Sequence, residues 1–150
     1  RFYSLLPMLG TSLIVSGQIH WDVLWLAVPV GLITVAILHV NNVRDIVTDK
    51  RAGIQTFPML TGRDFGIWLY AFEVLFPYVW LLCLAFFGIA SWWILVALLS
   101  LPIAIGNVRA IMIYKKQNNY MCARLDEKTA QLQLLFSLLM IIGMSLSVYF

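Results

Sequence analysis

The chain has few charged residues and almost no cysteine. Only 11% of its 150 residues are Asp, Glu, Lys or Arg, whereas about a quarter of the residues in a soluble globular domain are charged. Its two cysteines, Cys83 in an apolar run and Cys122 in a loop, do not indicate a disulfide framework. No internal repeat, long linker or cleavable signal peptide is evident. Because 62% of the residues are hydrophobic, the composition indicates a polytopic membrane protein.

Three long runs without a charged residue define most of the membrane spans: 23–43, 74–108 and 129–150. The middle run has 35 residues and would extend about 52 Å as one helix, against a bilayer core of about 30 Å. It must therefore break, and the predicted turn is 88–91. We predict an all-α fold with one domain over residues 1–150. Its five transmembrane helices are expected at about 2–18, 22–40, 65–87, 91–113 and 130–150.

The basic residues predict the orientation in the membrane. When the five spans alternate across the bilayer, all ten Lys and Arg residues fall on one side. The connections on the other side, 18–21 and 88–91, carry none, so the basic face is predicted to be cytoplasmic. The net charge of +3 therefore reflects topology and not nucleic-acid binding. We expect an integral membrane protein, in a bacterial cytoplasmic membrane rather than a eukaryotic internal one.

Polar residues are concentrated between 41 and 53, a stretch with two carboxylates, two amides and three cations. Asn41, Asp45 and Asp49 are spaced four apart, so a helix places them on one face about 5–6 Å from one another. Carboxylate and amide oxygens suit Mg²⁺, which commonly bridges carboxylates to substrate phosphates. These three residues are the predicted metal ligands. The competing interpretation is an ordinary solvated loop beside a membrane span.

Cations and amides in the same stretch are placed to bind phosphate oxygens. The predicted diphosphate-binding residues are Asn41, Asn42, Arg44, Lys50 and Arg51. Three further polar residues lie in or at the ends of predicted spans and form a candidate acceptor site: His39, Glu73 and Arg109. An intramembrane carboxylate suggests function, but a hydrogen-bonded Glu73 or His39 inside the bundle and an Arg109 that snorkels to the interface remain open alternatives.

The motif resembles a known family. Residues 41–53 read Asn-Asn-Val-Arg-Asp-Ile-Val-Thr-Asp-Lys-Arg-Ala-Gly and are followed by Thr56 and Thr61-Gly62-Arg63. This pattern is similar to the second Asp-rich motif of the UbiA superfamily of intramembrane prenyltransferases, in the form of its 1,4-dihydroxy-2-naphthoate polyprenyltransferase branch. Leu38-His39 and 128–135 are also similar. The resemblance covers the chain but only the second half of the family's nine-helix fold, without the first Asp-rich motif.

The resemblance implies Mg²⁺-dependent transfer of a polyprenyl group from its diphosphate to an aromatic acceptor, 1,4-dihydroxy-2-naphthoate of menaquinone biosynthesis in the similar branch. Asp45 and Asp49 would be the catalytic metal ligands. The expected partners are the lipid bilayer, the two substrates, and the missing amino-terminal half or a second copy, and the isolated chain is expected to be inactive. A non-catalytic fragment or subunit, a different aromatic acceptor and, more remotely, a transporter remain open.

Overall fold

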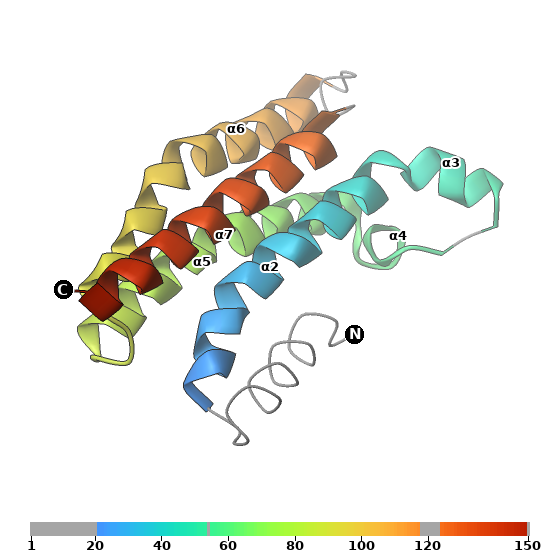
Figure 1. Cartoon of the computed structure of the whole chain (residues 1–150). Coiled ribbons are helices and arrows are strands. Elements are labelled where there is room, and N and C mark those ends of the chain that lie inside the picture. The colour runs from blue at the N-terminus through green and yellow to red at the C-terminus, as the bar shows by residue number, and fades with distance from the viewer. Residues whose placement is uncertain (1–20, 54, 118–123, 150) are drawn as a thin grey trace.

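A computed structural model describes residues 21–53, 55–117 and 124–149, and every regular element within these ranges is a helix (Figure 1). The elements are α2 (Trp21–Arg44), α3 (Ile46–Arg51), α4 (Phe57–Thr61), α5 (Arg63–Phe86), η1 (Trp92–Ser100), α6 (Leu101–Gln117) and α7 (Leu125–Tyr149). Four stretches are long and apolar enough to cross a membrane: Val23–Arg44, Asp64–Phe86, Trp92–Ile113 and Leu125–Tyr149.

These four stretches confirm four of the five predicted spans, and the fifth, 2–18, lies outside the described residues. Three helices extend four or five residues further than predicted, and one of them is α6, which ends at Gln117 instead of residue 113. Helix α2 continues past residue 40 to Arg44, and α7 begins at Leu125 instead of residue 130. The predicted limits stopped at polar residues, but a helix can continue beyond the apolar core. Asp126 and Glu127 lie in the first turn of α7, where the helix dipole favours negative charge.

The predicted break at 88–91 is present. Helix α5 ends at Phe86, and Gly88 has a φ of +69°, a left-handed conformation that glycine adopts without steric cost. The Ile89 N–H donates a hydrogen bond to the Leu84 carbonyl at 3.0 Å, which satisfies a carbonyl that the end of the helix leaves unpaired. The chain therefore reverses direction here and returns through the bundle.

The fourth span begins as a 3₁₀-helix, although the sequence predicted one continuous helix over 91–113. Element η1 continues for nine residues, whereas 3₁₀ segments longer than three or four residues are uncommon. Pro102 has no N–H to donate, and the Leu98 carbonyl accepts from the Leu101 N–H instead. A Cβ atom added at Gly143 would clash with the Trp93 carbonyl. The backbones of η1 and α7 are therefore in close contact.

Helix α2 packs against α5 and α7, and α7 also packs against η1. In Figure 1, α2 and α7 lie side by side. The buried core residues recur every three or four positions, as expected of helices that present one face to their neighbours. They include Ile33, Ala36, Val40 and Val43 of α2, Ile67, Val74 and Leu81 of α5, and Leu132, Phe136 and Met140 of α7. In lipid, such close packing and interhelical hydrogen bonds hold helices together.

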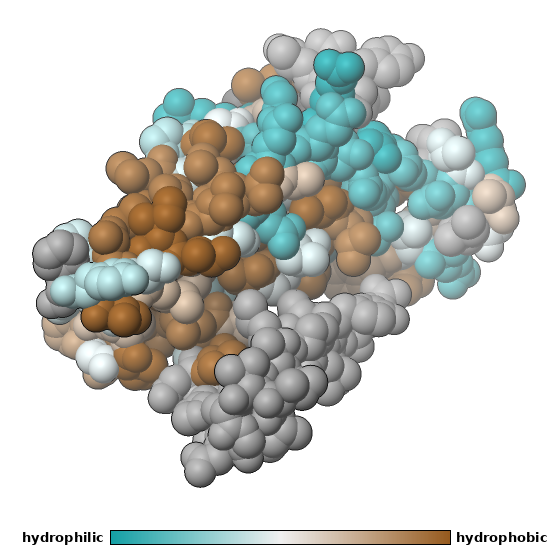
Figure 2. Space-filling model, viewed as in Figure 1, coloured by the Kyte–Doolittle hydropathy of each residue, from teal (hydrophilic) through white to brown (hydrophobic). Residues whose placement is uncertain are grey.

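Polar surface gathers at one end of the bundle. Figure 2 shows hydrophilic residues around α3 and the start of α7, and mainly hydrophobic residues over the rest of this face. Large apolar side chains such as Leu38, Phe72 and Leu134 are exposed along the long helices, as expected of a surface that faces lipid. Helices α3 and α4 form the connection between α2 and α5 at the polar end (Figure 1).

Candidate functional site

The Asp-rich segment, residues 41–53, begins in the last turn of α2 and continues through α3. Helix α2 ends at Arg44, and Asp45 forms a bend with φ −92° and ψ 8° before α3 begins at Ile46. The helical spacing nevertheless continues across this bend. The Asp45 N–H donates to the Asn41 carbonyl at 2.9 Å, and the Asp49 N–H donates to the Asp45 carbonyl at 2.8 Å. Asn41, Asp45 and Asp49 therefore lie on successive turns, although the helix is not continuous as the sequence predicted.

The side-chain oxygen atoms of Asn41, Asp45 and Asp49, which together form a stripe along the helix, fit a hard divalent cation. Oδ1 of Asn41 is buried and has no hydrogen-bond partner, and native proteins rarely leave a buried polar atom unpaired without a reason. Together with the carboxylates of Asp45 and Asp49, it supplies oxygen ligands of the kind that Mg²⁺ prefers. Within the described ranges, no three His, Cys, Asp or Glu side chains are close enough together to hold a metal ion. The stripe is thus a partial ligand set.

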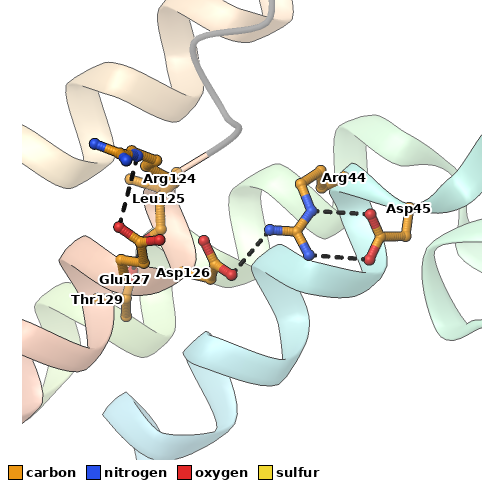
Figure 3. Close-up of polar contacts among 7 residues, drawn as sticks. All are labelled: Arg44, Asp45, Arg124, Leu125, Asp126, Glu127 and Thr129. Carbon is orange, nitrogen blue, oxygen red and sulfur yellow. Dashed lines mark hydrogen bonds and ion pairs between the residues drawn. The ribbon is translucent and has the colours of Figure 1, made fainter.

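Arg44 bridges two carboxylates at the edge of this stripe (Figure 3). Its Nε and Nη2 atoms donate to Oδ1 and Oδ2 of Asp45 at 2.9 and 3.1 Å. Its Nη1 donates to Oδ2 of Asp126, in the first turn of α7, at 2.9 Å. The two-point contact with Asp45 uses the planar geometry of the guanidinium group. Arg44 therefore joins the Asp-rich segment to the last helix.

The remaining predicted diphosphate-binding residues lie in the same region. Asn42 is partly buried in the last turn of α2, and Lys50 and Arg51 are exposed at the end of α3. Cations at the carboxyl end of a helix are favoured by its dipole, so local structure contributes to their placement. Their exposure leaves both side chains accessible to an anion.

His39 and Glu73 form a buried pair between α2 and α5. Nδ1 of His39 lies 3.1 Å from both carboxylate oxygens of Glu73, and the two residues are 6% and 5% exposed. In a neutral imidazole one ring nitrogen donates and the other accepts, so a His39 whose Nδ1–H donates to Glu73 keeps a lone pair on Nε2. That Nε2 atom is buried without a hydrogen-bond partner. The structure thus joins two of the three predicted acceptor-site residues.

Arg109, the third of these residues, is exposed on α6. The hydrogen bonds and ion pairs of the described residues do not join it to His39 or Glu73. Asn107, one half-turn earlier on α6, is buried, and its Nδ2 atom has no hydrogen-bond partner. On α6, the buried Asn107 is therefore a better candidate for the acceptor site than the exposed Arg109.

Sequence reasoning assigned no role to two polar groups near the site. Asp126 was not singled out, because an acidic residue near a helix start needs no special explanation. Thr56 precedes α4, and its buried Oγ1 atom also has no partner. The neighbouring ring of Phe57 packs edge-on against His39, with ring centres 5.8 Å apart. Unpaired polar atoms therefore gather where α2 and α4 meet. The separation of 82 residues between Arg44 and Asp126 left no local signal of their contact.

Comparison with known proteins places these features in context. Residues 2–139 match the sequence profile of the UbiA prenyltransferase family. The Drosophila melanogaster UbiA prenyltransferase domain-containing protein 1 homolog is 36% identical over 130 residues, which are 85% of this chain and 34% of that protein. The Bacillus subtilis (strain 168) 1,4-dihydroxy-2-naphthoate octaprenyltransferase is 29% identical over 134 residues, 89% of this chain and 42% of that protein.

The human UbiA prenyltransferase domain-containing protein 1 is 34% identical over 121 residues, which are 81% of this chain and 33% of that protein. The chain thus spans between 33% and 42% of the length of these three curated relatives. No solved structure matches it significantly.

Proposed function

Because the chain belongs to the UbiA prenyltransferase family, we propose that it forms the diphosphate-binding part of an intramembrane enzyme that transfers a polyprenyl group to an aromatic acceptor. The observation that carries this proposal is the stripe of Asn41, Asp45 and Asp49, with its unpaired amide oxygen and its neighbouring cations. The residues that complete the metal site come from a part of the enzyme that this chain does not contain. The charged end of the bundle faces the cytoplasm.

In this proposal, Asp45 and Asp49 hold Mg²⁺ together with Oδ1 of Asn41. Bound Mg²⁺ supplies positive charge that stabilises the diphosphate as a leaving group. Asn42, Lys50 and Arg51 donate hydrogen bonds to phosphate oxygens, and the exposed position of the two cations suits this role. The prenyl chain lies in lipid against the apolar flank of the bundle while its charged head stays at the polar end.

The His39–Glu73 pair binds the acceptor in the same proposal. Glu73 accepts a hydrogen bond from Nδ1–H of His39 and fixes the orientation of the imidazole ring. The lone pair on Nε2 is then available to accept a hydrogen bond from an acceptor hydroxyl. Supporting this role, Nε2 is buried and without a partner, and a polar pair within a membrane span is a functional candidate by default.

The acceptor is 1,4-dihydroxy-2-naphthoate in this proposal. Its support is the resemblance of the motif to that branch and the naphthoate octaprenyltransferase among the relatives. An aromatic diol presents hydroxyl groups for hydrogen bonding, and its carboxylate is attracted to the basic end of the bundle. A comparison of this substrate with 4-hydroxybenzoate, at equal concentrations of prenyl diphosphate, tests the assignment. Faster turnover of 4-hydroxybenzoate would reject it.

The central experiment measures prenyl transfer by the complete protein in detergent or liposomes, with and without Mg²⁺. Chelation of Mg²⁺ and the single variants Asp45→Ala and Asp49→Ala should each reduce the rate about 100-fold or more. The matched control is Glu127→Ala, which removes an exposed carboxylate at the same end of the bundle. Activity that survives either Asp substitution would rule out the metal-site assignment.

Residues 1–150 produced alone should be inactive, since the two carboxylates of the stripe lack the rest of the ligand set. Co-production with the amino-terminal part of the enzyme should restore prenyl transfer. Activity of residues 1–150 alone would show that a second copy, or this chain by itself, completes the site.

The His39→Asn variant tests the acceptor site separately from the metal site, because its side chain can still donate toward Glu73 but lacks Nε2. It should raise the KM for the acceptor about tenfold, with little change in the KM for the prenyl diphosphate.

A further inference from the structure

The contact between Arg44 and Asp126 suggests a role for a residue outside the predicted site. Asp126 is 25% exposed, Arg44 is 32% exposed, and the Nη1–Oδ2 distance between them is 2.9 Å. The other two nitrogens of the guanidinium group each donate to one oxygen of Asp45. One cation is therefore shared between a proposed metal ligand and a carboxylate on α7 (Figure 3).

This sharing affects how Asp45 can bind a metal ion. An arginine that faces both oxygens of a carboxylate uses the same atoms that a divalent cation requires, so Arg44 and the cation compete for Asp45. The charge of Arg44 and Asp45 together is zero, and a neutral pair attracts a divalent cation poorly. With Asp126 included, the three residues carry a net charge of −1. Asp126 therefore restores the negative charge that Arg44 cancels.

We propose that Asp126 is a positioning residue for the prenyl transfer reaction: it holds Arg44 when Asp45 binds the divalent cation. This inference rests on the proposed function of the Asp-rich stripe. Oδ2 of Asp126 already accepts from Arg44, and Oδ1 is buried without a partner. Asp126 can therefore accept a second hydrogen bond from the guanidinium group without losing an existing one. The retained Arg44 then stays beside the site, where a diphosphate also carries negative charge.

The neighbouring ion pair provides a matched control. Arg124 and Glu127 are 3.8 Å apart, three residues apart in sequence, and their side chains are 80% and 63% exposed. Figure 3 shows this pair beside the Arg44–Asp126 contact but separate from the Asp-rich segment. Glu127→Gln and Asp126→Asn remove the same charge from adjacent positions. A difference between the two variants therefore reflects the contact with Arg44 and not net charge.

The test measures Mn²⁺ binding to the complete protein in detergent, without substrates, from the electron paramagnetic resonance signal of free Mn²⁺. Asp126→Asn should raise the Kd about 3- to 10-fold. This is a small effect for a residue that contacts a metal ligand through another side chain, because the Arg44–Asp126 pair is partly exposed. Glu127→Gln should leave the Kd within about twofold of the wild type. Arg44→Gln should lower the Kd or leave it unchanged, because it removes the competing cation.

The different expected effects of Asp126→Asn and Arg44→Gln on the Kd for Mn²⁺ distinguish a positioning role of Asp126 from a structural one. If Asp126 only stabilised the fold, Asp126→Asn and Arg44→Gln would weaken Mn²⁺ binding alike, and that result would overturn the inference. Equal Kd values for Asp126→Asn and Glu127→Gln would also overturn it. If Asp126→Asn does not fold, weaker binding by Arg44→Gln alone is sufficient to reject the proposal, and tighter or equal binding supports it.

The Asp45→Asn variant distinguishes this inference from the proposed function. If Asp45→Asn abolishes Mn²⁺ binding and Asp126→Asn has no effect, the metal site stands and the role of Asp126 is rejected. If Asp45→Asn has no effect on Mn²⁺ binding, the metal-site assignment fails and the inference fails with it. As a further check, Asp126→Asn should have a smaller effect on the Kd in an Arg44→Gln background than in the wild type, since part of its effect acts through the contact with Arg44.

Discussion

Within the described part of the chain, helix α2 makes two contacts with neighbouring helices that involve a carboxylate. They start from residues five apart on α2 and lie in different surroundings. His39 pairs with Glu73 of α5, and both are at least nine-tenths buried. Arg44 pairs with Asp126 of α7 at the polar end, where both side chains are about a quarter to a third exposed. Burial makes the loss of one partner costly, whereas exposure to water makes it mild. The first contact is therefore expected to matter for stability and the second mainly for the charge of the site.

The sharpest test of this comparison is Glu73→Leu in the complete protein. It leaves the Nδ1–H group of His39 buried without an acceptor, so the free energy of unfolding should fall by about 2–3 kcal/mol. SDS titration in mixed micelles, followed by circular dichroism, measures this loss. Glu73→Gln keeps an acceptor oxygen and is the matched control, with a smaller expected loss. An equal loss in both variants would mean that His39 does not depend on the acceptor that Glu73 provides.

The double variant His39→Leu/Glu73→Leu examines the same pair from the other side. Replacing both members with apolar residues removes two buried polar groups together, so its stability should lie within about 1 kcal/mol of the wild type. Prenyl transfer should nevertheless fall, because the proposed acceptor contact is lost. The same SDS titration and an activity assay separate the two effects. Losses that add up from the single variants would show that the residues do not act as a pair.

The sequence predicted the spans better than it predicted these contacts. Hydrophobic runs and the Gly88 turn are local signals, and they placed four helices correctly. His39 and Glu73 were both identified as intramembrane polar residues, but their pairing depends on how α2 packs against α5. Asp126 was not identified, since its partner Arg44 is 82 residues away. The bend at Asp45 and the 3₁₀ geometry of η1 were also missed, because both depend on more than hydrophobic pattern.

The exposed contact should respond to salt, unlike the buried one. Asp126→Asn should reduce the free energy of unfolding by about 1 kcal/mol or less at low ionic strength. The difference from the wild type should shrink further in about 1 M salt, where the Debye length is about 3 Å. Unfolding of Asp126→Asn and Glu73→Leu at both salt concentrations measures the contrast. If the loss of stability in Asp126→Asn did not depend on salt, the Arg44–Asp126 contact would behave like the buried His39–Glu73 contact, and the proposed difference between them would be wrong.

A third contact separates the effect of burial from that of a donor left without an acceptor. Tyr70 of α5 and Thr129 of α7 are buried and neutral, and their hydroxyl oxygens lie 2.8 Å apart. Thr129 donates its only hydroxyl proton to the Leu125 carbonyl at 2.6 Å, so the Tyr70 hydroxyl is the donor between them. Tyr70→Phe therefore leaves Thr129 hydrogen-bonded to Leu125.

The free energy of unfolding of Tyr70→Phe should fall by only about 0.6 kcal/mol, the average for interhelical hydrogen bonds in membranes. The control is Tyr149→Phe, which alters an exposed tyrosine at the end of α7 and should have no measurable effect in the same SDS titration. A loss for Tyr70→Phe as large as that for Glu73→Leu would show that burial alone determines the energetics. The expected small loss would instead assign the sensitivity of the His39–Glu73 contact to the buried Nδ1–H donor of His39, which Glu73→Leu leaves without an acceptor.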